Sequence, residues 1–212
     1  MAVEIRCPKL YVIGDRSVFR SDKDWLEALR DVGNALNPEN AALQIRVKGS
    51  SDETRWQRMK LARGVIAPAM GRGLRVFVNA TPSKAREFGY TGVHLTEARI
   101  PDEPISPPLT LEVAASVHSL DAIQKAYRAG VSFAVYGPIF KPKSKRATPV
   151  GLESLRQVSR VAPLPLLALG GITPERVNSC IDAGAAGVAC ISSVMKSSNR
   201  PRMIERLLGQ NN

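Results

Sequence analysis

The sequence is poor in cysteine, histidine and aromatic residues, and each shortage excludes a class of protein. Among 212 residues there are three cysteines and two histidines, and aromatic residues make up 5%. Cys7, Cys180 and Cys190 are odd in number and have no CxxC spacing, so we expect buried or incidental thiols, with no disulfide scaffold and no zinc site. So few aromatic residues offer no stacking platform for single-stranded nucleic acid.

Long apolar runs are also missing. No run approaches the length needed to cross a bilayer, and the first ten residues, MAVEIRCPKL, lack the apolar stretch of a secretory signal. Low-complexity tracts are absent, and 44% hydrophobic residues suffice for one sizeable core. We therefore expect one domain over residues 1–212, a cytoplasmic location and no membrane partner.

The charge is strongly positive, with a formal net charge of +11. Such a balance is typical of proteins that bind nucleic acid, an acidic membrane surface or a phosphorylated small molecule. The basic residues are spread along the chain, and the densest run, Lys141 to Arg146, is short and has only Phe140 as an aromatic neighbour. This distribution favours an anionic small-molecule substrate over nucleic acid.

Apolar segments alternate with amphipathic ones along the whole chain. We expect strands at residues 9–15, 42–48, 74–79, 92–95, 111–117, 133–136, 164–169 and 187–191. A helix is expected after most strands, including one over residues 51–68, whereas the proline-rich segment 98–109 predicts a loop or a single turn. Roughly eight strand–helix units in this length predict an α/β fold, a single-domain TIM (β/α)₈ barrel.

The stretch from 165 to 195 is the most informative. One predicted strand ends at Gly170-Gly171, where a side chain would block close approach of a ligand, and the next ends at Ser192-Ser193. Backbone N–H groups gathered at neighbouring strand ends can hold an anion, which predicts a phosphate site. The plainer alternative is that Gly-Gly only makes a tight strand exit and Ser-Ser only ends a strand. The spacing, which suits one strand–helix–strand unit, favours phosphate.

The second predicted strand places Gln44, Arg46 and Lys48 on one face. Inside a barrel a charge is tolerated near the mouth, usually because a ligand pairs with it. We predict that the three residues bind the substrate, with the two cations on its carboxylate. Pairing of these cations with Glu97 or Asp15 at the rim is an alternative of nearly equal weight.

Four further polar residues are candidates with different roles. His118 follows a predicted strand just before a helix capped by Ser119, which places it at the mouth, whereas His94 lies mid-strand and is expected to be a structural imidazole bonded to a neighbouring backbone group. Asn79 is a plausible polar wall of the pocket. Lys145 either belongs to a solvated loop or reaches the phosphate or carboxylate of the substrate.

Several segments together resemble the thiamine phosphate synthase/TenI superfamily over nearly the whole chain. They are KLYVIGD, the Gln-x-Arg-x-Lys of the second strand, SVHSLDA, YGPIF with its lysines, and LALGGITPERVNSCIDAGAAGVACISSVM. The resemblance implies a TIM barrel from thiamine biosynthesis. It further implies that a thiazole phosphate is held through amides at Gly171, Ile191 and Ser192.

Two departures distinguish the branches of this superfamily. Its synthases carry an Asn-Asp pair after the third strand and a Gly-Gln-x-Asp run after the fourth, and the two aspartates bind the Mg²⁺ that holds a pyrophosphate. This chain has Ala80 and Arg99 at those places. Because Mg²⁺ needs hard oxygen ligands, and Glu97 alone is a poor substitute, we expect no metal site.

The resemblance therefore implies the TenI-like branch, a thiazole tautomerase in which His118 of the SVHS run moves protons on a carboxythiazole phosphate without metal or other cofactor. Two alternatives stay open. One is a thiamine phosphate synthase, a transferase that joins hydroxymethylpyrimidine diphosphate and thiazole phosphate. The other is a non-catalytic regulator that binds thiazole phosphate. The oligomeric state, including a homo-oligomer, is also open.

Overall fold

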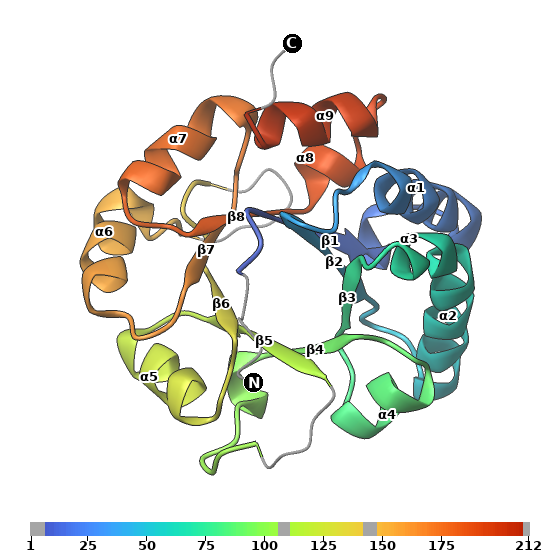
Figure 1. Cartoon of the computed structure of the whole chain (residues 1–212), viewed down its shortest axis with the longest axis horizontal. Coiled ribbons are helices and arrows are strands. Elements are labelled where there is room, and N and C mark those ends of the chain that lie inside the picture. The colour runs from blue at the N-terminus through green and yellow to red at the C-terminus, as the bar shows by residue number, and fades with distance from the viewer. Residues whose placement is uncertain (1–6, 106–110, 142–147, 210–212) are drawn as a thin grey trace.

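The computed structural model of the chain describes residues 7–105, 111–141 and 148–209. Eight parallel strands form a closed barrel in chain order, and this confirms the predicted TIM barrel (Figure 1). The strands are β1 (Leu10–Asp15), β2 (Ala41–Arg46), β3 (Arg75–Val78), β4 (Gly92–Leu95), β5 (Glu112–Val117), β6 (Phe133–Tyr136), β7 (Leu166–Leu169) and β8 (Gly187–Cys190).

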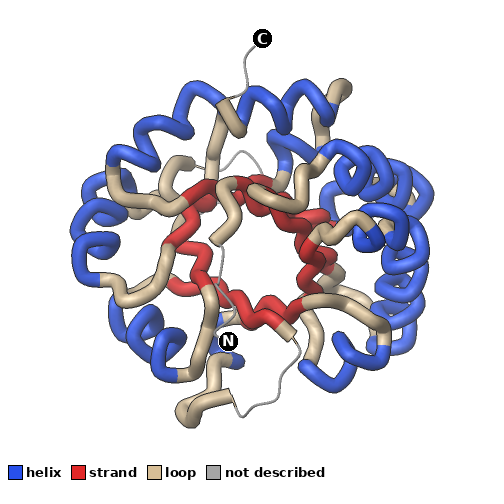
Figure 2. Tube along the Cα trace, in the orientation of Figure 1, coloured by secondary structure: helices blue, strands red, loops and turns tan. Residues whose placement is uncertain are grey.

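Helices surround the ring of strands (Figure 2). They are α1 (Asp22–Ala35), α2 (Asp52–Val65), α3 (Ala67–Gly71), α4 (Pro82–Glu87), α5 (Leu120–Arg128), α6 (Gly151–Val161), α7 (Pro174–Asp182), α8 (Ser192–Met195) and α9 (Arg200–Leu207). The helix expected over residues 51–68 is divided, because Pro68 lacks an N–H for the helix interior and instead stands in the first turn of α3. Between β4 and β5 the described residues contain a 3₁₀ turn, Glu97–Arg99, as the prolines predicted.

The interior of the barrel is filled at mid-height by three aromatic rings. Ring centroids lie 5.5 Å apart for Tyr11 and Phe77, 5.3 Å for Tyr11 and Phe133, and 5.4 Å for Phe77 and Phe133, all in edge-to-face geometry. All three side chains are fully buried. The barrel is thus a packed core without a pore, and a ligand cannot pass through it.

A second, larger apolar core separates the strands from the helices. Outward-facing residues of β2 such as Leu43 and Ile45 belong to it, while Ala42 faces the barrel interior. This alternation confirms the expected period of two along β2. None of the helices within the described part of the chain is long and apolar enough to span a membrane.

The loop after β6 packs directly on the two glycines after β7. Ile139 N donates to Leu169 O over 2.7 Å, and Phe140 N donates to Gly170 O over 3.0 Å. A Cβ on Gly170 would lie 2.5 Å from Pro138 Cβ, and one on Gly171 would lie 2.8 Å from Phe140 Cβ. Glycine is therefore required here because the neighbouring loop leaves no room for a side chain. From the sequence alone, the two glycines are attributed to close approach of a ligand.

We predict that Gly170→Ala lowers the free energy of unfolding by about 2–4 kcal/mol, since a left-handed backbone and a steric clash act together. The φ angle of Gly170 is +104°. Urea unfolding measures the loss.

Gly130→Ala is the matched control, because Gly130 has a φ of +83° and a Cβ added there would meet nothing within 4 Å. It should cost about 1–2 kcal/mol from the backbone alone. Equal losses in the two variants would show that packing of the β6 loop does not require glycine.

Candidate functional site

The predicted site residues gather at one end of the barrel, where the carboxyl ends of all eight strands meet. We call this end the mouth. Arg46 ends β2, Asn79 follows β3, His118 follows β5, Gly170 follows β7 and Ile191 follows β8. Lys145, the remaining predicted contact from a loop, lies outside the described residues.

Among the described residues the Arg46 side chain has a hydrogen-bond partner and the Gln44 side chain has none. Gln44 is 2% exposed, and its amide forms no hydrogen bond with another described residue. Arg46 Nη1 donates to Asp15 Oδ2, which confirms the rim pairing that the sequence left open. Because no described residue satisfies it, the Gln44 amide is available to a ligand.

Asp15, in turn, is fully engaged within the chain. Its Oδ1 accepts hydrogen bonds from Ser17 N over 2.9 Å and from Ser17 Oγ over 2.7 Å, while Oδ2 holds Arg46. The carboxylate is 3% exposed. It orients Arg46 at the mouth, where Lys48 is exposed beyond the end of the strand.

Asn79 braces the backbone beside these cations. Its Oδ1 accepts from Val47 N and its Nδ2 donates to Val47 O, both over 3.0 Å. The pair continues the β2–β3 ladder past the strand ends and fixes the segment between Arg46 and Lys48. The structure thus gives Asn79 a supporting contact in addition to its predicted place in the pocket wall.

His118 stands at the rim with Glu97 as its partner. His118 Nδ1 lies 2.7 Å from Glu97 Oε2, and the His118 side chain is 63% exposed. Glu97 belongs to the turn after β4. The contact leaves Nε2 of the imidazole without a partner among the described residues, and therefore open to a substrate.

His94 has side-chain partners, so the expected bond to a backbone group is wrong. Its Nδ1 lies 3.1 Å from Tyr11 Oη, and its Nε2 lies 2.8 Å from Ser116 Oγ. Burial, the main cause, lowers the pKa of His94 to about 3, and the positive charges of Arg46 and Lys48 act in the same direction. The imidazole is neutral at ordinary pH.

Tyr11 and Ser116 are the side-chain partners of His94, and they were not predicted from the sequence. Both face the barrel interior, Tyr11 within the interior cluster and Ser116 two residues beyond Ala114 of that cluster. The period of two along β1 and β5 was the signal that could have indicated them. Ser116 is the polar residue that β5 presents inward just below the mouth.

The anion site predicted after β7 and β8 has the backbone it needs. The amides of Gly170 and Gly171 donate no hydrogen bond to another described residue. Ser192 was expected to end a strand, but it begins α8 instead. Its amide has no partner within that helix. Gly171, Ile191 and Ser192 are all half-buried. Unpartnered amides of this kind suit an anionic oxygen.

The residues that would have to hold Mg²⁺ do not fit it. Ala80 is 2% exposed and carries no oxygen on its side chain, Arg99 is a cation, and Glu97 is paired with His118. Across residues 7–105, 111–141 and 148–209, no group of three or more His, Cys, Asp or Glu side chains could hold a metal ion. The chemistry of these donors is wrong for a hard divalent cation.

The three thiols are unreactive in their surroundings. Burial raises the pKa of Cys7 to about 12, of Cys180 to about 11 and of Cys190 to about 12. All three are free cysteines, with Cys180 and Cys190 buried, as expected from the sequence. None of them is a candidate nucleophile.

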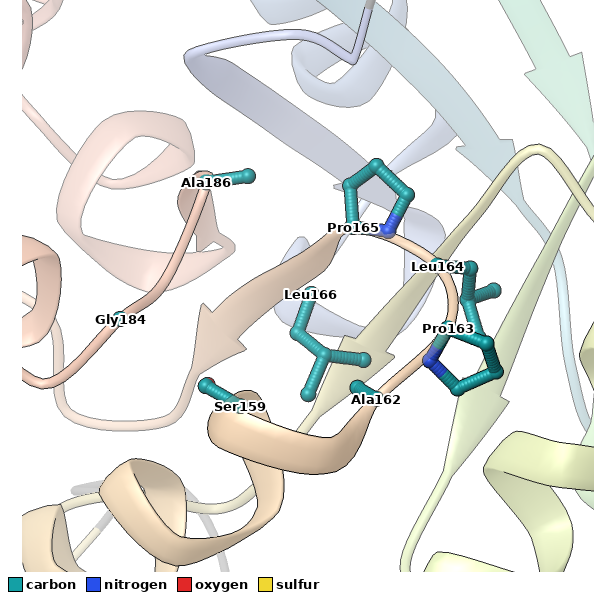
Figure 3. Close-up of a pocket in the computed structure, with 8 residues that line it drawn as sticks. All are labelled: Ser159, Ala162, Pro163, Leu164, Pro165, Leu166, Gly184 and Ala186. Atoms are coloured by element: carbon teal, nitrogen blue, oxygen red, sulfur yellow. The ribbon is translucent and has the colours of Figure 1, made fainter.

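A pocket of about 280 Å³ lies at the other end of the barrel (Figure 3). Leu166, the first residue of β7, and Ala186, which precedes β8, both line it. The remaining lining residues are Ser159, Ala162, Pro163, Leu164, Pro165 and Gly184. It has no charged group and is separate from the mouth, so we assign it no part in the site.

Comparisons with known proteins agree on one family. The family model described as thiamine monophosphate synthase matches residues 10–194. The thiamine-phosphate synthase of Koribacter versatilis is 32% identical over 92% of this chain and 92% of its own. That of Pyrococcus abyssi is 30% identical over 94% of this chain and 92% of its own.

A solved structure shares the fold. Thiamine phosphate pyrophosphorylase from Pyrococcus furiosus superposes with a TM-score of 0.72 and 24% identity, over 95% of this chain and 94% of that one. At this identity the likeness concerns the fold alone.

The predicted TenI-like tautomerase is contradicted by these relatives. The two relatives reported above are similar over almost the whole chain and are named thiamine-phosphate synthase, and they give no support to the TenI branch. The prediction rested on two substituted positions, Ala80 and Arg99, and on a histidine at the mouth. The resemblance holds for the superfamily, and the isomerase assignment is wrong.

The buried neutral state of His94 predicts a loss of stability in acid. An unfolded histidine has a pKa near 6.5, so the unfolded chain binds an extra proton as the pH falls below that value, whereas folded His94 does not until about pH 3. The stabilising contribution is present above pH 6.5 and lost as the pH falls. Between pH 7 and pH 5 we expect the wild type to lose about 2 kcal/mol more than His94→Gln in urea unfolding.

His118→Gln is the control, because it retains His94 and should lose as much stability as the wild type. Equal losses in the wild type and His94→Gln would contradict a buried neutral imidazole.

Proposed function

Because this chain belongs to the thiamine monophosphate synthase family, we propose that it is a transferase that joins hydroxymethylpyrimidine diphosphate to thiazole phosphate and releases diphosphate. The similarity to thiamine-phosphate synthases over almost the entire barrel is the observation that carries the proposal. The mouth supports it with two kinds of anion-binding group, backbone amides and cationic side chains.

In this proposal the amides after β7 and β8 bind thiazole phosphate. Gly170 and Gly171 supply N–H groups that have no partner among the described residues, on a backbone that the β6 loop holds in place, and Ile191 and Ser192 follow the neighbouring strand β8. Fixed amides lose little freedom when an anion binds, which favours binding. Thiazole phosphate would thus be anchored by its phosphate, with the ring toward the centre of the mouth.

The diphosphate would lie toward β2. Departure of diphosphate places negative charge on the leaving oxygen, and a cation fixed nearby stabilises that charge as it develops. Arg46 is fixed by Asp15, and Lys48, two residues beyond it, also acts on His94 through its charge. These two residues, predicted from the sequence for a carboxylate, are here assigned to phosphate oxygens.

Gln44 and His118 complete the proposed contacts. The buried Gln44 amide can donate and accept, which suits the polar atoms of a heterocycle. Glu97 orients His118 so that Nε2 faces a bound substrate. Lys145, outside the described residues, stays a predicted contact. The single domain over 1–212 and the cytoplasmic location also remain predictions, and the oligomeric state stays open.

The test is an assay of the purified protein with both substrates, with Mg²⁺ and separately with EDTA. We expect thiamine phosphate and diphosphate to form in both conditions, within about a threefold difference in rate, because the described residues offer no metal site. Activity only with Mg²⁺ would contradict our interpretation of Ala80 and Arg99. Binding of thiazole phosphate without any product would overturn the transferase and leave a non-catalytic binder.

Lys48→Met tests the cationic side of the mouth. Loss of one charge that contacts diphosphate should lower kcat/KM by about tenfold or more. Arg160→Met, which removes an exposed charge in the last turn of α6, is the matched control and should keep the wild-type rate. Equal rates for the two variants would exclude Lys48 from the diphosphate contact.

A further inference from the structure

A chain of three side chains runs from the packed interior to the mouth. Tyr11 Oη lies 3.1 Å from His94 Nδ1, and His94 Nε2 lies 2.8 Å from Ser116 Oγ. The three residues come from β1, β4 and β5, and the rings of Tyr11 and His94 stack at 5.7 Å between centroids. The transferase chemistry proposed above uses none of them.

Tyr11 determines which atom donates and which accepts in these two hydrogen bonds. Its side chain is fully buried, and His94 is its one hydrogen-bond partner among the described residues. If Nδ1 carried the imidazole proton, the phenol proton of Tyr11 would have no acceptor in an apolar interior, which is costly. The phenol therefore donates to Nδ1, and burial keeps it protonated by raising its pKa well above the usual value.

The state of His94 follows from that donation. A neutral imidazole that accepts at Nδ1 carries its proton on Nε2. Burial among aromatic rings, together with the nearby charges of Arg46 and Lys48, disfavours the imidazolium that could donate from both nitrogens. Nε2–H therefore donates to Ser116 Oγ.

Ser116 is left with one free proton. Its Oγ accepts from His94, and no other described residue takes its hydroxyl hydrogen. Ser116 is half-buried at the penultimate position of β5 and faces the interior just below the mouth. Because Ser116 Oγ accepts from His94 on its interior side, its own hydrogen can be donated only in another direction. The direction that remains is toward the mouth.

We infer that Tyr11 and His94 are positioning residues that make Ser116 a one-way hydrogen-bond donor to an acceptor-only anionic oxygen of the ligand. The inference rests on the proposed function only for the class of that ligand, a phosphate or diphosphate. A serine that rotated freely would spend part of its time with a lone pair toward the anion, so a fixed proton favours anion binding.

The protonated nitrogen of His94 can be observed directly. The chain has two histidines, so the ¹⁵N-histidine NMR spectrum of the full-length protein contains two imidazoles, and His118→Gln assigns the one that remains. We expect His94 to carry its proton on Nε2 at neutral pH. A proton on Nδ1 would overturn the inference, whatever the enzymatic activity of the protein.

Binding of inorganic diphosphate, measured by calorimetry, tests the consequence at the mouth. Ser116→Ala should weaken the affinity about tenfold, as expected for one hydrogen bond to a charged group. Tyr11→Phe keeps the ring but frees the imidazole to exchange tautomers, so it should weaken binding about two- to threefold through the smaller population of competent protein. The double variant should bind as weakly as Ser116→Ala alone, because Tyr11 acts only through the serine.

Tyr136→Phe is the matched control. Tyr136 is also a buried tyrosine of a barrel strand whose hydroxyl meets a serine, Ser154 Oγ at 2.8 Å, but it belongs to the outer core. It should leave diphosphate affinity unchanged. Unchanged affinity in Ser116→Ala would refute the inference. Inactivity in the transferase assay with these binding results intact would refute the proposed function and leave the inference standing.

Discussion

The closed ring of parallel strands forces every second side chain into an enclosed interior, and the rest of the molecule depends on how that interior is filled. Tyr11, Phe77 and Phe133 occupy its middle and contact one another edge to face. They form the floor of the mouth and exclude water from below. Polar residues can then stand above them only where a protein partner or a ligand satisfies them. Among the described residues Gln44 has no side-chain hydrogen bond and Ser116 meets His94 alone, so both are candidates for contact with a ligand.

The shape of the mouth depends on packing of the loop after β6 against the segment after β7, as well as on the strands. The loop after β6 donates two backbone hydrogen bonds to the end of β7, and it occupies the space that side chains at 170 and 171 would fill. These glycines are held by contacts on one side, and their amides donate to no other residue in the described part of the chain. The same packing thus supports the fold and presents donors to an anion. This explains why a stability measurement on Gly170 also bears on the site.

Local patterns predicted most of the fold, and long-range contacts account for what they missed. Ser119 caps α5 as expected and accepts from Ala122 N over 3.1 Å, because a cap depends on residues three positions apart; Ser21 caps α1 in the same way. The eight strands also follow from local apolar runs. The partners of His94 could not be predicted in this way, since Tyr11 lies 83 positions away in the sequence. Their meeting is a consequence of barrel closure and register, which no local pattern contains.

The mistaken branch assignment has an electrostatic explanation. Two missing aspartates indicate which ion the protein can hold, but the reaction needs positive charge near diphosphate and not a particular ion. In the synthase pattern two aspartates and one Mg²⁺ sum to no net charge. Here Glu97, which stands at the glutamine of that pattern, and Arg99 also sum to no net charge, and Ala80 is neutral. Arg46 and Lys48 add to the positive potential that acts on His94 below them. A mouth without the metal is therefore no less positive than one with it, and the substitutions that argued against a synthase are compatible with the charge such a reaction requires.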